Sequence, residues 1–102
     1  MAEFRAQSVV PAAHACLPGH FPGRPIVPGV LLLEHVLDAA QRWRGPGSRL
    51  AGLPAVKFLS PLLPDERFDI LLQEDGARIR FTCSVGARML AQGALTLCAE
   101  TP

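Results

Sequence analysis

The feature that most limits the fold is a predicted helix that is apolar on nearly every side. Pro28 suits its first turn, because proline lacks the N–H that would have no partner there. Gly45-Pro46-Gly47 ends it. A helix with so little polar surface must be surrounded by protein. The apolar residues are Val30, Leu31, Leu32, Leu33, Val36, Leu37, Ala39, Ala40 and Trp43.

The rest of the chain is patterned for strands. Residues 4–10 predict a first strand, and residues 13–17 predict a second extended piece. Residues 56–59 predict a strand after the helix, which breaks at the proline-containing stretch 60–66. Alternating apolar and polar side chains then predict half-buried strands. These strands lie around residues 68–72, 79–85 and 89–99.

Two short turns join the last three predicted strands. Asp75-Gly76 is a strong two-residue hairpin signal, and a second turn is expected near Gly86-Ala87. These turns predict a three-strand antiparallel meander. The simplest packing is an α+β fold in which an antiparallel sheet wraps around the one long helix. Such a single sheet leaves one edge or face available for pairing with a second copy.

Length and composition limit the class of protein. The 102 residues fit a single domain, 1–102, and 49% of them are apolar, which favours an oligomer. A net charge of +1 gives no electrostatic case for binding nucleic acid or a membrane surface. No segment has the length and apolar character of a membrane span, and no signal peptide is visible. Cys16, Cys83 and Cys98 lack a CxxC spacing and favour a reducing, cytoplasmic compartment.

His20 is the first candidate for catalysis. It lies in a loop, residues 18–29, whose backbone is restrained by Pro18, Pro22 and Pro25. A general base needs such fixed placement, because small errors in position cost large factors in rate. The alternative is a loop histidine that caps a turn.

Glu34 is the second candidate, because it lies inside the apolar helix. Apolar surroundings raise the pKa of a carboxyl group, so a buried Glu34 could hold a proton to donate. The alternative is a thin solvated stripe of Glu34, Asp38 and Arg42, spaced four residues apart. The spacing does not decide between the two.

Gly29 is the third candidate, because it follows Pro28 at the start of the helix. A glycine N–H at a helix start can approach a ligand's carbonyl oxygen, with the positive end of the helix dipole behind it. The alternative is an ordinary turn glycine. His14, Cys16 and His20 do not have the spacing of a zinc site, and we expect no metal.

These residues resemble a known motif. The pattern H-F-P-G-x-P-x-x-P-G-V followed by an acid is present as residues 20–30 with Glu34. It is similar to that of the FabA/FabZ-type 3-hydroxyacyl-acyl-carrier-protein dehydratases, which have the hot-dog fold. The stretch 56–66, "VKFLSPLLPDE", extends the resemblance weakly toward the end of the chain.

The resemblance implies a role for each motif residue. His20 matches the base that removes the C2 proton of a 3-hydroxyacyl thioester, and Glu34 matches the acid that helps the 3-hydroxyl leave as water. Gly29 matches the oxyanion donor. In the family the base and the acid come from different subunits, which implies a homodimer or larger oligomer with shared sites. No cofactor is implied.

The resemblance also implies a substrate and a partner. An apolar tunnel along the helix should hold the acyl chain. The substrate is carried by an acyl carrier protein, and charge alone suggests basic residues for docking it. The expected tunnel residues are Phe21, Pro28, Val30 and Leu33, and the docking candidates are Arg24, Arg42, Arg44, Arg49 and Lys57.

The chain departs from the larger family members in two ways. They begin with a P-H-R-Y-P-F-type segment that this sequence lacks, so it resembles the short ApeI-like dehydratases of aryl-polyene and related lipid or polyketide pathways. Asp38 stands where many relatives have Gln. Two alternatives stay open: a hot-dog acyl thioesterase, and a non-catalytic acyl-binding or heteromeric partner subunit.

Overall fold

The computed structural model of the chain describes residues 2–12 and 26–99. The extended piece predicted at residues 13–17 lies outside these ranges, as does most of the predicted proline-containing loop. Within them, no helix is long and apolar enough to cross a membrane.

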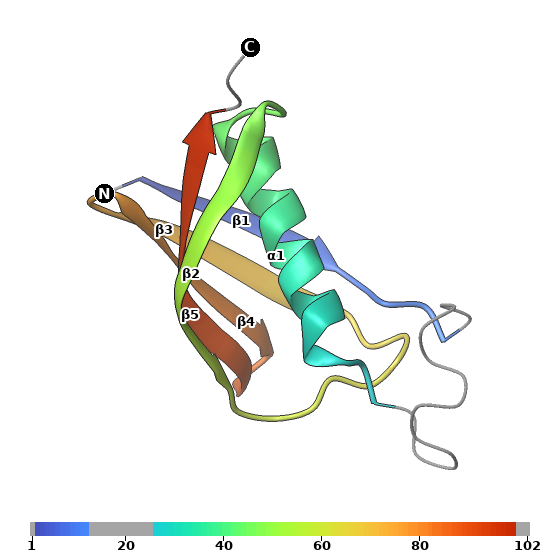
Figure 1. The fold of residues 1–102 in the computed structure, drawn as a ribbon. Helices are drawn as coiled ribbons and strands as arrows, with labels where there is room; N and C mark the ends of the chain where they lie inside the picture. Colours follow the sequence, from blue (N-terminus) through green and yellow to red (C-terminus); the bar gives the residue numbers. More distant parts are fainter. Residues whose placement is uncertain (1, 13–25, 100–102) are drawn as a thin grey trace.

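One helix packs across one face of a five-stranded antiparallel sheet (Figure 1). The spatial order of the strands is β1-β3-β4-β5-β2, so the chain forms a meander from β3 to β5 and places β2 outside β5. This confirms the predicted α+β architecture. The elements are β1 (Glu3–Ser8), α1 (Gly29–Arg44), β2 (Ser48–Phe58), β3 (Phe68–Asp75), β4 (Arg78–Val85) and β5 (Arg88–Ala99).

The core lies between the helix and the meander. Alternate residues of β3, among them Phe68 and Leu72, are buried, and so are Phe81 and Cys83 of β4. They form one cluster with the helix residues Leu31, Leu32, Val36, Ala39 and Ala40. Each fully buried large apolar side chain contributes about 1.5–3 kcal/mol, so this cluster fixes which side of α1 faces the sheet.

The helix begins and ends where the sequence predicts. Pro28 is extended at its N-terminus (φ −60°, ψ 142°), and Gly45 at its C-terminus has φ 116°. The prediction that protein surrounds the helix is wrong for the single chain. Successive turns present an exposed stripe to solvent, because the sheet covers only one side of α1. The stripe consists of Val30, Glu34, Asp38 and Arg42.

Two local predictions also need correction. Strand β2 begins at Ser48, well before the predicted residue 56, although Gly52 and Pro54 lie within it. Its pairing with β5 is irregular there. In the first hairpin Asp75 pairs with Arg78, so the loop residues are Gly76-Ala77, with Gly76 at φ 62°. The second turn, Gly86-Ala87, is confirmed.

The two edges of the sheet differ in chemistry. Edge strand β1 exposes Glu3, Arg5 and Gln7. Edge strand β2 instead leaves Leu50 and Leu53 exposed, at 44% and 40%. Charged residues protect a sheet edge from further pairing, whereas an apolar edge invites it. The β2 edge therefore has the larger exposed apolar surface, although Arg49, Pro54 and Lys57 are also exposed on this strand.

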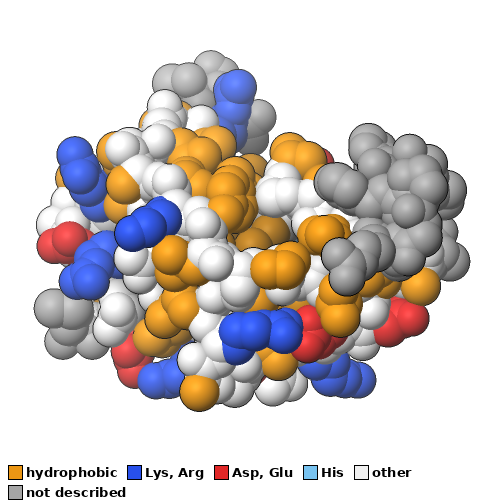
Figure 2. Space-filling view, turned by 90° about the horizontal axis from the view of Figure 1, so that it is seen from below, with side chains coloured by type: hydrophobic (Ala, Val, Ile, Leu, Met, Phe, Trp, Pro, Cys, Tyr) orange, Lys and Arg blue, Asp and Glu red, His pale blue; other side chains and the backbone are white. Residues whose placement is uncertain are grey.

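A second apolar surface lies at the end of the molecule where α1 begins. We call it the apolar end; it consists of Val30, Phe58, Leu59 and Leu63, which are 43–62% exposed. Figure 2 looks onto this end and shows hydrophobic side chains gathered on it. Exposed apolar surface of this kind usually marks a binding site or an interface.

Candidate functional site

A pocket of about 390 Å³ opens beside the start of α1. Gly29 and Leu32 line it from the helix, and Phe58 lines it from the end of β2. The loop from Leu59 to Leu62 completes the wall. Apart from Ser60 and exposed backbone, the lining side chains are apolar, so the pocket suits an apolar group.

Gly29 places a backbone donor at this pocket. The first N–H groups of a helix have no acceptor within the helix, and none for the Gly29 N–H occurs elsewhere among the described residues. The positive end of the helix dipole lies behind it. The position can therefore stabilise a developing negative charge on an oxygen, as an oxyanion donor does.

Phe58 packs closely against the backbone of Gly29. A Cβ added at Gly29 would lie 2.7 Å from Cζ of the Phe58 ring and 2.8 Å from its Cε1. The ring thus packs directly on the backbone at the helix start. The sequence predicted Phe58 only as part of the strand "VKFL". Its contact with Gly29 joins residues far apart in the chain, so no local sequence pattern signals it.

Glu34 lies on the exposed stripe of α1, one turn beyond Val30. Of the two alternatives that the spacing left open, the solvated stripe describes the position of Glu34 in the single chain, and the buried carboxyl group does not. The predicted pair within that stripe is present: Arg42 Nε lies 3.1 Å from Asp38 Oδ2. Both side chains are more than half exposed, so the pair adds little stability.

The structure brings together some of the predicted site residues. Pro28, Gly29 and Val30 lie at the helix start, and Glu34 follows on the same exposed side as Val30. Leu33 is half-buried and packs against the core cluster. His20, Phe21 and Arg24 lie outside the described residues.

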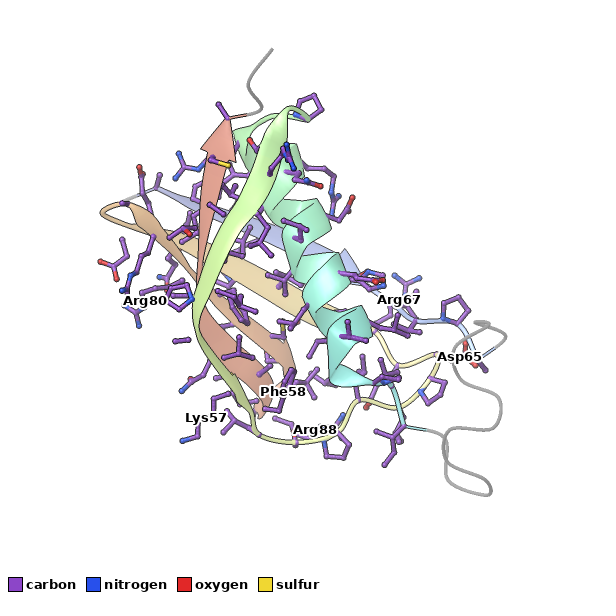
Figure 3. The ribbon with its side chains drawn as sticks, viewed as in Figure 1. Lys57, Phe58, Asp65, Arg67, Arg80 and Arg88 are labelled. Carbon is purple, nitrogen blue, oxygen red and sulfur yellow. The ribbon has the colours of Figure 1, made fainter. Side chains whose placement is uncertain are left out.

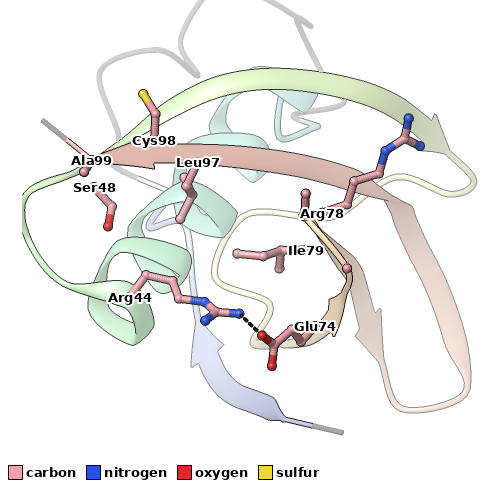
Figure 4. A pocket seen from close by; sticks show the side chains of 10 residues that line it. Arg44, Ser48, Glu74, Arg78, Ile79, Leu97, Cys98 and Ala99 are labelled. Carbon is pink, nitrogen blue, oxygen red and sulfur yellow. Dashed lines mark ion pairs between the residues drawn. The ribbon is translucent and has the colours of Figure 1, made fainter.

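Arg42 and Arg44 lie at the opposite end of α1 from Gly29. A rise of 1.5 Å per residue separates Gly29 from Arg44 by about 22 Å along the helix. Arg44 Nη2 lies 3.4 Å from Glu74 Oε1, and its guanidinium lies 4.2 Å from the centre of the Trp43 ring. Arg44 and Glu74 border a second pocket of about 280 Å³ (Figure 4). Lys57, in contrast, is beside Phe58 at the other end of the molecule (Figure 3).

Two other reactive side chains have structural roles. His35 Nδ1 is hydrogen-bonded to Ser8 Oγ. The His35 ring lies edge-on to the Phe68 ring, with 5.8 Å between the ring centroids. His35 therefore joins the helix to β1 and β3. Burial raises the pKa of the Cys83 thiol to about 12, which keeps it protonated and unreactive. In the described ranges no three His, Cys, Asp or Glu side chains are grouped to hold a metal ion.

Comparison with protein families and known sequences gives a consistent result. The model of the ApeI-like family, described as ApeI dehydratase, matches residues 1–94. The chain is 37% identical over 93 residues to the 3-hydroxyacyl-[acyl-carrier-protein] dehydratase FabZ of Protochlamydia amoebophila, covering 85% of this chain and 57% of the relative. With FabZ of Mannheimia succiniciproducens it shares 38% identity over 66 residues, or 57% of this chain and 44% of the relative. The chain thus spans about half the length of these curated relatives.

Solved structures share the same fold. A dehydratase heterocomplex, ApeI:P from Xenorhabdus doucetiae, superposes with a TM-score of 0.82 at 28% identity, over 94% of this chain and 87% of that one. The fluoroacetyl-CoA thioesterase FlK superposes with a TM-score of 0.73 at 16% identity, over 96% and 86%, a likeness of fold alone. One helix on a five-stranded antiparallel sheet is the hot-dog arrangement that the sequence motif implied.

Proposed function

The chain belongs to the ApeI-like dehydratase family, and from this premise we propose that it is a hydro-lyase acting on a 3-hydroxyacyl thioester of an acyl carrier protein. The product is the trans-2-enoyl thioester, for fatty-acid, aryl-polyene or related lipid or polyketide biosynthesis in the cytoplasm. The observation that carries the proposal is that Gly29, whose N–H has no acceptor among the described residues, lines an apolar pocket at the start of α1.

The proposed chemistry needs three groups. His20 removes the C2 proton, and the electrons of that C–H bond form the C2=C3 double bond. Glu34 donates a proton to the 3-hydroxyl group, which leaves with the C3–O electrons as water. The Gly29 N–H stabilises the negative charge that develops on the thioester oxygen. The acyl chain extends along Pro28, Val30 and Leu33 with Phe21.

The exposure of Glu34 supports a site shared between two copies. Glu34 is exposed, and no hydrogen bond or ion pair to its carboxyl group occurs among the described residues. A second chain placed over that face would exclude water from it. The apolar end and the apolar residues of the β2 edge are surfaces through which two copies could meet. We therefore propose a homodimer or larger assembly in which His20 of one copy acts with Glu34 of another.

The carrier-protein surface is proposed on charge. Arg24, Arg42 and Arg44 are the candidates, together with Lys57, which precedes Phe58 at the end of β2. Arg42 and Arg44 already make ion pairs within the chain, so docking there would have to compete with Asp38 and Glu74.

The test is conversion of a 3-hydroxyacyl carrier protein to the enoyl form, measured at several acyl chain lengths. We expect His20→Ala and Glu34→Gln each to lower kcat at least about a hundredfold, the usual contribution of a general acid or base. Glu3→Gln, at an exposed acid of β1, is the control and should keep kcat. Full turnover by His20→Ala would contradict the mechanism.

Mixing two inactive variants tests whether the site is shared. His20→Ala and Glu34→Ala chains are unfolded, mixed and refolded together. Mixed dimers should regain one intact site, so about a quarter of the wild-type activity per chain is expected if pairing is random. No recovery would show that both groups act within one chain.

A partner subunit is the second candidate, because ApeI:P is described as a dehydratase heterocomplex. On that hypothesis the purified chain alone shows no turnover, and activity appears only when a second, homologous subunit is added. The thioesterase alternative predicts release of free thiol instead of enoyl product. The same assay therefore separates all three.

A further inference from the structure

The loop of residues 60–66 touches both described ends of the segment that carries His20. We call this loop the clamp loop. At the far end of the segment, the Val27 N–H donates to the Leu62 carbonyl oxygen at 2.9 Å. At the near end, the Asp65 N–H donates to the Val10 carbonyl oxygen at 2.8 Å, and Asp65 Oδ1 accepts the Ala12 N–H at 2.9 Å. One short loop thus holds the chain on both sides of residues 13–25.

Asp65 has an unusual backbone. Its φ of 65° is in the left-handed region, and among the described residues it is the only non-glycine residue there. Aspartate tolerates this region better than most residues, but glycine occupies it at lower cost. Glycine, however, has no carboxylate to accept the Ala12 N–H. The position therefore keeps a strained residue whose side chain makes a specific contact, a pattern common at functional sites.

The clamp loop is itself anchored. Ser60 Oγ donates to the Met89 carbonyl oxygen at 2.7 Å, and Arg88 Nη2 lies 2.6 Å from Glu66 Oε1. Both partners belong to β5, whose neighbour β4 is in the core of the sheet. Figure 3 shows Asp65 at the side of the molecule from which the chain leaves β1. The contacts therefore connect Ala12 and Val27, through the clamp loop, to β5.

The same loop also borders the Gly29 pocket. Ser60, Pro61 and Leu62 line the pocket, while Leu62 and Asp65 hold the ends of the segment. A base and an oxyanion donor act together only at a fixed separation. A single element that lines the Gly29 pocket and contacts the residues on both sides of the His20 segment is well placed to set that separation.

We propose that Asp65 is a positioning residue for the dehydration, which fixes the His20 segment relative to Gly29 through the Ala12 hydrogen bond. This inference rests on the proposed function. It assigns Asp65 no contact with substrate. Its effect is expected on kcat, because a displaced base slows the chemical step while the apolar pocket still binds the acyl chain.

The test compares two substitutions at one position. Asp65→Gly relieves the strain of the left-handed backbone and removes the acceptor for the Ala12 N–H. The thermal midpoint of this variant should therefore change little. Its kcat should fall about tenfold or more, and its KM should stay within about threefold of the wild-type value. Asp65→Asn keeps an acceptor oxygen and tolerates the same φ, so kcat should stay within about threefold of wild type. Asp69→Ala is the matched control. Asp69 is an exposed residue of β3, and its Oδ1 also accepts one hydrogen bond, from Gln7 Nε2 at 3.0 Å.

Amide hydrogen exchange at Ala12 gives a readout that does not depend on activity. We expect protection of this amide in the wild type and in Asp65→Asn, and its loss in Asp65→Gly. Wild-type kcat in Asp65→Gly would overturn the proposal, as would equal losses in Asp65→Asn or Asp69→Ala. An inactive wild type would instead refute the proposed function, while the exchange at Ala12 would still report whether the clamp exists.

Discussion

Gly29 and Gly93 both lie closer to a neighbour than a side chain would allow, but the neighbours are of different kinds. At Gly29 an added Cβ would meet only the far end of the Phe58 ring, which is 52% exposed and can turn away. At Gly93, inside β5, it would overlap the Ala55 carbonyl oxygen and lie 2.8 Å from Cζ of the buried Phe81. Backbone held in a sheet cannot yield in the same way.

Alanine at the two positions should therefore have unequal effects on stability. We expect Gly93→Ala to lower the free energy of unfolding by about 1–3 kcal/mol, the usual cost of overpacking. Gly29→Ala should change it by less than about 1 kcal/mol, because the ring can move and alanine favours a helix. Urea denaturation of both variants measures the difference, and equal losses would contradict this account.

Glu34 shows why the site was only partly predictable at this scale. Apolar residues flank it in the sequence, so its neighbours in the chain favour burial. Its exposure depends on which side of α1 faces the sheet, and the apolar residues on both sides leave that choice to tertiary packing. The roles of His20 and Glu34 came from the motif and stay predictions.

At the scale of elements, the clamp loop is held partly by charge. The Leu63 N–H donates to Glu66 Oε1 at 3.2 Å, and Arg88 lies against the same oxygen. The hydrogen bond from Leu63 has the larger effect and Arg88 adds to it, so that together they lower the pKa of the Glu66 carboxyl group below its usual 4.5. A carboxyl group with a lowered pKa stabilises the fold when ionised, and the contribution is lost as pH falls through the folded-state pKa.

Acid should therefore weaken the wild type more than a variant without this carboxylate. The stabilisation by Glu66 is fully present above pH 4.5 and declines below it. We expect the thermal midpoint of Glu66→Gln to be lower than that of the wild type at pH 6. The two midpoints should approach each other toward pH 3. Parallel curves over this range would show that Glu66 makes no such contribution.

The elements differ in how well the sequence predicts them. Strand β4 was predicted because Ile79, Phe81 and Cys83 alternate with polar residues, and the structure buries that face. The first half of β2 was missed because Gly52 and Pro54 are strand breakers in local terms. Proline is tolerated there because β2 is an edge strand, whose outer N–H groups need no partner within the sheet. Edge position is a property of the topology, which local pattern does not contain.

At the scale of the whole molecule, the difference between the two sheet edges predicts which edge pairs with a second copy of the chain. A lysine placed on the apolar β2 edge should disturb association, since burying a charge there is costly. We expect Leu53→Lys to shift the proposed dimer toward monomer in sedimentation velocity and to lower activity in parallel. Gln7→Lys, which adds the same charge to the β1 edge, is the matched control. A wild-type sedimentation coefficient for Leu53→Lys would place the interface elsewhere.

The unequal edges also limit how far such an assembly can grow. If two copies join through β2, each uses the more apolar of its two edges, and the combined sheet presents a β1 strand at either side. Those strands are short and expose Glu3 and Arg5, which discourages the addition of a third chain. Strand pairing then stops at two copies and does not propagate into a fibre, so the same asymmetry that invites association also protects the protein from aggregation.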